Sequence, residues 1–251
     1  GGMAIFWERF VRLFHTGLVS CVAIVATFAG FQPILAEDGD PASVATQIEG
    51  TWMPESYSPR LLTIGGETPP LTAEAAALYR DRTAQADDPD RQYDRTRWCA
   101  GAGIPRIMLL PYPFEIRADG NYLGFIHGWY RWHRMVDMSG EPVDPILWQT
   151  MGYPVGRWLP DGVVIDTVGI SSETVLDEFG LPHSDEMQLT ERLRPLEDGT
   201  LEVTFTITDP EFYTKPWETV MTYRRVDEIV GDDVCPDRLV TGEPAVRRAL
   251  P

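Results

Sequence analysis

Two charged residues lie on apolar stripes of the chain, and they are the first candidates for chemistry. Arg134 and Glu191 each belong to a run in which every second residue is apolar. The apolar members of these runs are Trp132, Val136 and Met138 around Arg134, and Met187, Leu189 and Leu193 around Glu191. Residues two apart in a β-strand share a face, and a buried ion costs several kcal/mol unless it is paired or used. We therefore expect the two to meet as a buried salt bridge, which either fixes strand register or anchors a polar group of a ligand.

Two further titratable residues lie on apolar faces of expected strands. His127 shares a face with Leu123 and Phe125, and Asp166 shares one with Val164 and Val168. An inward histidine near a carboxylate can act as a general acid or base, and a second inward acid would complete an acid/base pair. The alternatives are a core histidine bound to a backbone carbonyl and an Asp166 bound to Arg157 or to neighbouring backbone.

His183 stands in a loop directly before the Glu191 strand, within the run His-Ser-Asp-Glu. It either joins His127 and Glu191 at a cavity mouth or belongs to a turn that caps backbone donors. A zinc ion held by these three side chains is conceivable, but no pair of them has a diagnostic spacing. We therefore predict no metal and no cofactor, and the predicted catalytic set is His127, Glu191, His183 and Asp166.

Aromatic residues are frequent around these positions and suggest a pocket for a flat apolar ligand. We expect Trp132, Tyr213 and Trp217 to bind such a ligand, with Arg134 orienting its oxygen. Many of the aromatic residues are equally compatible with an ordinary hydrophobic core.

The elements that must position these residues are mostly short strands separated by turns. Alternating runs are bounded by Asp-Gly turns at residues 119–120, 161–162 and 198–199, the pattern of an antiparallel meander. The expected strands are residues 48–53, 114–117, 122–127, 130–138, 155–158, 163–168, 187–194, 201–208 and 217–225. This predicts an all-β, up-and-down meander of about 8–9 strands that closes into a calycin-like or lipocalin-like barrel. A two-sheet β-sandwich is the alternative.

Three segments between the first two expected strands lack the alternating pattern of a strand. Residues 69–82 predict one N-terminal helix, with Thr72 as its N-cap and Glu74 in its first turn. The charged run 85–97 predicts a surface loop. The apolar run 105–113 between prolines predicts an edge segment packed on the core.

The N-terminal residues predict export. A basic start, an apolar stretch over residues 17–31 and a small residue at Ala36 describe a signal peptide at residues 1–36. Residues 10–36 alternatively form a membrane anchor. Residues 37–48 are then a polar linker, and residues 49–251 form one domain in the periplasm or outside the cell.

Charge and cysteine content narrow the possible partners. The net charge of −17 disfavours nucleic acid and anionic lipid. Export into an oxidising space favours a disulfide between Cys99 and Cys235, and a catalytic thiol lacks a supporting motif.

Four motifs together resemble a large family of exported bacterial β-rich proteins to which no reaction is assigned. They are GRW-x-x-DG-VV-x-DT from Gly156, PHS from Pro182, TER from Thr190 and DP-x-x-YTKPW from Asp209. The resemblance covers residues 50 to 225. It implies an exported β-rich domain with a shared site, and it implies no reaction.

Two functions fit these observations. The first is an exported barrel that binds a small hydrophobic or aromatic molecule, with acid–base transformation of that molecule as an open extension. The second is a non-catalytic accessory subunit that its N-terminal helix anchors to a membrane protein complex. The two differ in the fate of residues 10–36.

Overall fold

The computed structural model describes residues 41–88, 90–130, 132–145, 147–231 and 233–246. The predicted signal peptide or anchor, residues 1–36, lies outside the described residues. Among the helices that are described, none is both long and apolar enough to cross a membrane.

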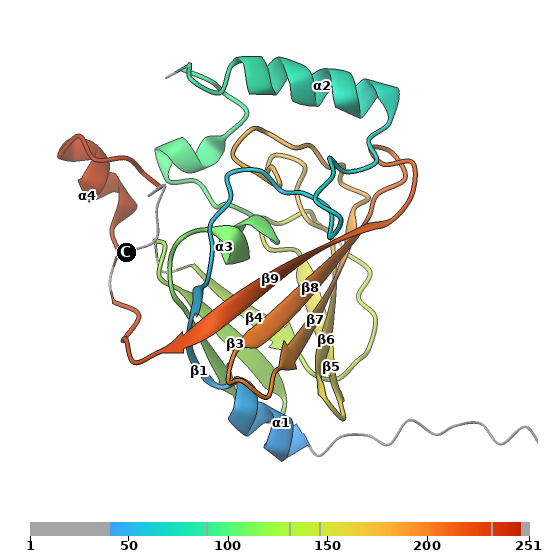
Figure 1. The fold of residues 1–251 in the computed structure, drawn as a ribbon, viewed down its shortest axis with the longest axis vertical. Coiled ribbons are helices and arrows are strands. Elements are labelled where there is room, and N and C mark those ends of the chain that lie inside the picture. The colour runs from blue at the N-terminus through green and yellow to red at the C-terminus, as the bar shows by residue number, and fades with distance from the viewer. Residues whose placement is uncertain (1–40, 89, 131, 146, 232, 247–251) are drawn as a thin grey trace, which may run out of the picture. The chain divides into compact units, whose positions relative to one another are not determined.

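The described residues form one closed β-barrel of nine strands (Figure 1). Each strand pairs with the next along the chain, and β9 pairs with β1 to close the sheet. The strands are β1 (Gly50–Pro54), β2 (Phe114–Ala118), β3 (Tyr122–His127), β4 (His133–Asp137), β5 (Tyr153–Leu159), β6 (Gly162–Val168), β7 (Gln188–Pro195), β8 (Leu201–Thr208) and β9 (Trp217–Val226). The predicted up-and-down barrel is therefore confirmed, and the alternative sandwich is wrong because the sheet has no open edge between β9 and β1.

One junction of the barrel departs from the antiparallel meander. β4 and β5 run parallel and pair only through Asp137 and Val155, because the chain crosses back along the barrel through residues 138–152 before β5 begins. The other neighbouring strands are antiparallel and pair over three to eight positions. The β4–β5 junction is thus the weakest ladder in the wall.

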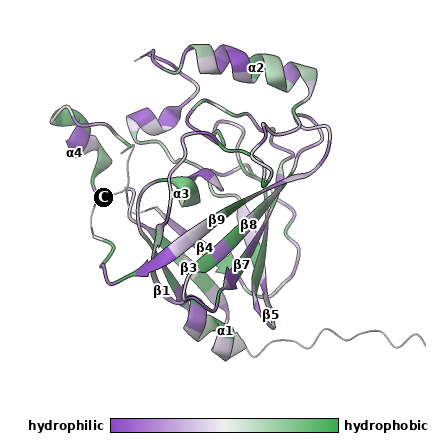
Figure 2. Cartoon of the chain, viewed as in Figure 1, coloured by the Kyte–Doolittle hydropathy of each residue, from purple (hydrophilic) through white to green (hydrophobic). Residues whose placement is uncertain are grey.

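Alternation of side chains places the core inside the barrel. β8 is the clearest example, since its residues alternate between buried and half-buried along its whole length, and hydrophobic and hydrophilic residues interleave along the strands (Figure 2). The Asp-Gly turns at Gly120 and Gly199 have φ of +91° and +85°, conformations that glycine adopts without a Cβ clash. These turns fix the register of the hairpins they join.

Helices lie at both ends of the barrel, with α1 at one end and α2 at the other, and α4 lies to the side (Figure 1). They are α1 (Pro41–Ile48), α2 (Ala73–Ala84), the 3₁₀ helix η1 (Arg95–Trp98), α3 (Arg106–Leu109) and α4 (Cys235–Val240). α2 is the predicted helix, and the Thr72 side chain accepts a hydrogen bond from the Ala75 amide as its N-cap. The other helices were not predicted.

α1 corrects the prediction of a polar linker for residues 41–48, and residues 37–40 lie outside the described residues. Val44 and Ile48 are buried in the core, and the Ile48 carbonyl accepts a hydrogen bond from the Trp52 indole at 2.8 Å. Two side chains on one face of an eight-residue helix suffice to dock it, although its composition is otherwise polar. α1 therefore covers the barrel end at which the short turns lie.

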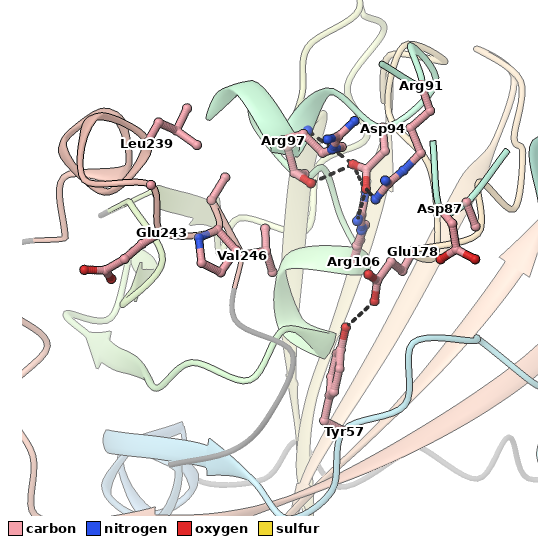
Figure 3. A pocket seen from close by; sticks show the side chains of 15 residues that line it. Tyr57, Asp87, Arg91, Asp94, Arg97, Arg106, Glu178, Leu239, Glu243 and Val246 are labelled. Atoms are coloured by element: carbon pink, nitrogen blue, oxygen red, sulfur yellow. Dashed lines mark hydrogen bonds and ion pairs between the residues drawn. The ribbon is translucent and has the colours of Figure 1, made fainter. Parts of the chain in front are cut away.

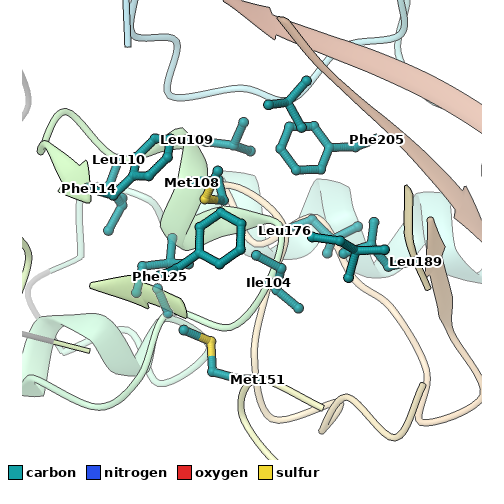
Figure 4. Close-up of a cluster of buried hydrophobic side chains, with 14 of the residues drawn as sticks. Ile104, Met108, Leu109, Leu110, Phe114, Phe125, Met151, Leu176, Leu189 and Phe205 are labelled. Carbon is teal, nitrogen blue, oxygen red and sulfur yellow. The ribbon is translucent and has the colours of Figure 1, made fainter. Parts of the chain in front are cut away.

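The opposite end of the barrel holds an inserted segment, residues 102–112, which we call the plug. It contains α3, and all eleven of its residues are buried. Met108 lies in one cluster with Phe125, Leu189 and Phe205 from the barrel wall (Figure 4). The expectation of an edge segment is corrected, since this apolar run enters the barrel mouth instead of extending the sheet.

A disulfide fastens the chain beside the plug. Cys99 at the end of η1 is bonded to Cys235 at the start of α4, as the sequence predicted. It attaches residues 233–246, the C-terminal arm, to the segment that leads into the plug. Trp129 strengthens this attachment, because its indole donates a 2.8 Å hydrogen bond to the Ala245 carbonyl.

Candidate functional site

The barrel interior holds a cluster of polar side chains below the plug. His127 is the last residue of β3, Arg134 lies near the start of β4 and Thr167 near the end of β6. Because these strands alternate in direction, all three positions lie toward the same end of the barrel. Glu191 of β7 completes the cluster, and the four side chains are at most 2% exposed. The predicted inward orientation of Arg134, Glu191 and His127 is confirmed.

Arg134 and Glu191 form a bidentate salt bridge across the interior. Arg134 Nη1 and Nη2 donate to the two carboxylate oxygens of Glu191 at 3.0 and 2.5 Å. Nη2 also donates to Thr167 Oγ1 at 2.7 Å. Planar, two-point pairing is the strongest arrangement open to a guanidinium and a carboxylate. The pair links β4 to β7 and so spans the weak β4–β5 junction from within.

His127 lies beside this pair in an apolar environment. Its ring stacks against Phe125 at a centroid distance of 6.3 Å and lies 5.9 Å from that of Phe114. Burial, and next the positive charge of Arg134, lower the pKa of His127 from 6.5 to about 3. The imidazole is therefore neutral at physiological pH.

Two atoms of this cluster lack hydrogen-bond partners among the described residues. They are His127 Nε2 and Arg134 Nε, both buried. More than nine-tenths of buried polar groups in proteins have a protein or water partner, and an unsatisfied one costs about 1–3 kcal/mol. The interior therefore retains unused hydrogen-bonding capacity beside apolar rings.

Tyr223 of β9 connects the cluster to the plug. Its hydroxyl donates to the Met108 carbonyl at 2.9 Å, and its ring meets Phe114 edge-on at 5.0 Å. Burial and the nearby charge of Glu191 raise the pKa of Tyr223 well above 10, so the hydroxyl stays protonated and keeps donating. The position of α3 is thus linked to the polar interior by one hydrogen bond.

His183, predicted at the cavity mouth, takes part in a separate loop network. Its Nε2 lies 2.8 Å from Thr174 Oγ1 and its Nδ1 lies 3.0 Å from the Ser184 carbonyl. Ser184 in turn donates its amide and hydroxyl to Asp209 at 2.7 and 2.9 Å. Burial lowers the pKa of His183. This network holds the loop of residues 169–186 against the loop before β9. The hydrogen-bond partners of His183 are Thr174 and Ser184, and neither belongs to the interior cluster.

Asp166 does not face the interior, which corrects its predicted orientation. Its side chain is 49% exposed and pairs with Arg157 at 2.7 Å, and it accepts a 2.6 Å hydrogen bond from Thr190. Both faces of β6 carry buried valines, because Val163 and Val164 are each at most 5% exposed. Apolar residues on both faces leave the inward face ambiguous in the sequence. The predicted catalytic set therefore divides between the interior, a loop and the outer wall.

The predicted ligand-binding aromatic residues lie at the plug end of the barrel. Tyr213 and Trp217 have ring centroids 5.4 Å apart, and the Tyr213 hydroxyl donates to the Pro182 carbonyl at 2.7 Å. Trp132 is partly buried against the core. The indole nitrogens of Trp132 and Trp217 are buried without a partner among the described residues. Tyr213 is thus engaged in the loop network, whereas both tryptophans retain a free donor.

A second charged cluster was missed by sequence reasoning. Arg106, on the plug, donates two hydrogen bonds to Asp94 at 2.7 and 2.9 Å, and both side chains are at most 5% exposed. Burial alone would raise the pKa of Asp94, but the charge and hydrogen bonds of Arg106 lower it below its usual value. The signal was present, since Arg106 is a lone charge in an apolar run, as Arg134 is. The charged run 85–97, expected as a surface loop, instead contributes the buried Asp94 and Arg91.

An outer pocket of about 640 Å³ lies over this second cluster (Figure 3). Arg91, Asp94 and Arg106 form one wall, and residues 242–246 of the C-terminal arm line another. The interior cluster has no part in it, because His127, Arg134 and Glu191 are not among its lining residues. The polar cluster inside the barrel and this outer pocket are thus separate.

Comparisons with known proteins add little to this geometry. No protein-family model matches the chain. No curated protein matches it either. Among solved structures it is similar to a chain described as "REP1-NXSQ fatty acid transporter", with 13% sequence identity, a TM-score of 0.34, and coverage of 74% of this chain and 100% of that chain. A likeness this distant carries no conclusion about function, so the proposal that follows rests on this chain's own residues.

Proposed function

We propose that the protein binds a small, uncharged hydrophobic or aromatic molecule inside its barrel. The observation that carries this proposal is the pair of buried atoms His127 Nε2 and Arg134 Nε, which have no partner among the described residues and lie beside apolar rings. Barrels of about eight strands commonly hold one small ligand. One hydroxyl or carbonyl group of a ligand would satisfy these atoms while its hydrocarbon part contacts Phe114 and Phe125.

The charges of the interior favour a neutral ligand. Glu191 already neutralises Arg134 through two hydrogen bonds, and His127 is uncharged because its pKa is about 3. An anion would lack a free counter-charge in this dry environment, and its desolvation would oppose binding. The same pKa makes His127 a poor general base at neutral pH. We therefore propose a carrier or sensor, and catalysis by His127, Glu191, His183 and Asp166 stays a prediction of the sequence.

Entry to the interior requires the plug to move. Met108, Ile107 and Leu109 fill the barrel mouth and are at most 8% exposed, so a ligand takes the place that α3 occupies here. Methionine adapts its shape to a changed neighbour more easily than branched residues do. The Tyr223 hydroxyl donates a hydrogen bond to the Met108 carbonyl of the plug, and this bond must break when α3 withdraws.

Action outside the cytoplasm is part of the proposal. The Cys99–Cys235 disulfide is compatible with an oxidising compartment, and the N-terminal pattern of the sequence agrees with export. Anchorage to a membrane complex, the alternative function, depends on residues 10–36 and stays a prediction.

The test compares 1-naphthol with naphthalene, which differ only in a neutral hydroxyl group. Binding to the whole chain is measured by fluorescence titration at neutral pH. We expect naphthol to bind about tenfold more tightly, the value of one hydrogen bond of about 1.4 kcal/mol. In His127→Phe we expect this ratio to fall toward one while naphthalene still binds.

The control variant is His133→Phe, whose side chain is exposed on the neighbouring strand. It should keep the tenfold ratio, and thermal denaturation must show that both variants fold. If neither naphthol nor naphthalene binds the native protein, the interior does not admit ligands and the proposal fails. If the ratio of naphthol to naphthalene affinity is unchanged in folded His127→Phe, His127 does not contact the ligand.

A further inference from the structure

The outer pocket has the size and the wall composition of a separate binding site. Its volume of about 640 Å³ lies within the range of roughly 300–1,000 Å³ that is common for small-molecule sites. Figure 3 shows the charged side chains of Arg91, Asp94 and Arg106 gathered together, with Leu239 and Val246 on the side of the C-terminal arm. The pocket therefore has one charged wall and one apolar wall.

Arg91 is the residue of the charged wall that has unused bonding capacity. It is 6% exposed, its Nε has no partner among the described residues, and its Nη1 makes only a 3.4 Å contact to the Asp88 carbonyl. Its nearest carboxylate oxygen, Asp94 Oδ2, is 3.8 Å from Nη2. A guanidinium has five donors, so this buried cation is poorly satisfied.

Asp94 compensates Arg91 only from 3.8 Å, because Arg106 already engages both of its oxygens. Arg106 takes both Asp94 oxygens at 2.7 and 2.9 Å, and Thr96 donates its amide and hydroxyl to Asp94 Oδ1. A buried cation without a close counter-charge is costly unless a ligand supplies one. The charge that is missing at Arg91 is a single negative charge.

Groups at the rim define which anion fits. Asp87 and Glu243 are exposed pocket residues with negative charges, and they disfavour a dianion such as a phosphate ester. A carboxylate is planar and matches the guanidinium fork. The apolar wall of Leu239, Pro244 and Val246 suits a short hydrocarbon group.

From this arrangement we propose that the outer pocket binds a small monocarboxylate with an aliphatic or aromatic tail. The carboxylate binds Arg91, and the tail lies against the C-terminal arm. This site is independent of the proposed interior site, which takes neutral ligands, and either can exist without the other.

The test is isothermal titration calorimetry of the whole, disulfide-bonded chain with sodium hexanoate. We expect hexanoate to bind and 1-hexanol, which has the same chain without the charge, to bind at least tenfold more weakly at this pocket. Arg91→Gln should weaken hexanoate at least tenfold, and Arg91→Lys should weaken it less, because lysine keeps the charge and loses the fork. Affinity should also fall as salt concentration rises.

The matched control is Arg157→Gln, which removes an arginine from an ion pair on the outer barrel wall. It should leave hexanoate binding unchanged. Equal hexanoate affinity in the native protein and in folded Arg91→Gln overturns the proposal, as does the absence of binding at ~1 mM ligand, a concentration at which weak specific binding is still measurable. Titration of Arg91→Gln with 1-naphthol separates the two sites, since an unchanged naphthol affinity shows that only the outer pocket was altered.

Discussion

Two buried arginine–carboxylate pairs hold this molecule together, and their surroundings differ. Arg134 and Glu191 meet inside the barrel, where both are at most 1% exposed as side chains, and they join strands that are not neighbours in the sheet. Arg106 and Asp94 meet in the lining of the outer pocket, and they join the plug to the η1 segment. Similar chemistry therefore braces the barrel wall at one place and fastens a removable segment at the other.

The difference predicts how each pair responds when one partner is removed. An ion that loses its partner in a dry interior has no substitute, whereas water entering from a pocket can solvate the remaining ion. We expect the interior pair to determine global stability and the outer pair to determine how readily the plug opens.

The largest effect is expected from Glu191→Leu. Arg134 would then be buried with Thr167 as its hydrogen-bond partner among the described residues, and breaking such a pair costs about 3–5 kcal/mol. The measurement is the free energy of unfolding from urea denaturation. The double variant Arg134→Met/Glu191→Leu should recover most of the loss, because no unpaired charge remains. A single-variant loss below about 1 kcal/mol, the range of exposed pairs, would contradict a dry interior.

A smaller global loss, about 2–3 kcal/mol, is expected for Arg106→Met, since water from the outer pocket reaches Asp94. The specific effect is faster amide hydrogen exchange in the plug, measured at Met108 and Leu109, with exchange in β7 and β8 less affected. The matched variant Asp94→Leu should loosen the same segment. If hydrogen exchange became faster by the same factor throughout the barrel, the outer pair would determine global stability, as the interior pair does.

Acidification should reduce stability through the buried histidines. The pKa of His127 is about 3 in the folded chain and near 6.5 in the unfolded chain, so below pH 6.5 the unfolded state binds the extra proton. Stability is therefore complete above pH 6.5 and falls by about 1.4 kcal/mol per pH unit below it, or about 2 kcal/mol between pH 6.5 and pH 5. His183, whose pKa is also lowered, acts in the same direction.

The free energy of unfolding, measured by urea denaturation across pH 5–7, should depend less on pH in His127→Phe than in the native protein. The carboxylate of Asp94, whose pKa is lowered, contributes stability that is lost only below about pH 4. The titration of Asp94 therefore does not contribute to the stability change measured between pH 5 and pH 7. An unchanged slope in the variant would show that His127 is solvated in the native state.

The smallest effect is expected from Thr167→Val, which removes one hydrogen bond to Arg134. The loss should be about 1 kcal/mol, since the Glu191 pair remains. Thr190→Val is the exterior control, because Thr190 makes the corresponding hydrogen bond to the exposed Asp166. Thr190→Val should lower the free energy of unfolding by less than Thr167→Val does. The reverse order in denaturation experiments would contradict the expected difference between the interior and the outer wall.

Local patterns predicted the parts of the fold in which one face of a strand is apolar. The hairpin of β7 and β8 lies within one residue of its expected bounds, and the inward charges Arg134 and Glu191 were recognised because every neighbour two residues away is apolar. Thr72 was recognised as an N-cap because a hydroxyl precedes an acidic first turn.

The failures occur where burial comes from partners distant in the sequence. The plug contains four consecutive apolar residues after Arg106, and such a short run does not distinguish a strand from one turn of buried helix. Asp94 was predicted to be exposed to solvent, because its partner Arg106 is twelve residues later in the sequence, beyond η1. The orientation of Asp166 was predicted wrongly because β6 carries buried valines on both of its faces. The proposed monocarboxylate pocket is lined by five separate parts of the chain, and no local pattern brings them together.

The closure of the barrel through β1 and β9 also has a consequence for the order in which the protein assembles. β1 is the first strand to be synthesised, yet one of its partners is β9, with Thr51 opposite Val226 and Pro54 opposite Tyr223. Contacts between residues so far apart form slowly, because the entropy of closing the intervening chain opposes them. From β5 to β9, in contrast, each strand pairs with the one that follows it. In a chain made from its N-terminus, the strand that appears first is thus the last to gain both neighbours, and its edge stays unpaired until nearly the whole domain exists.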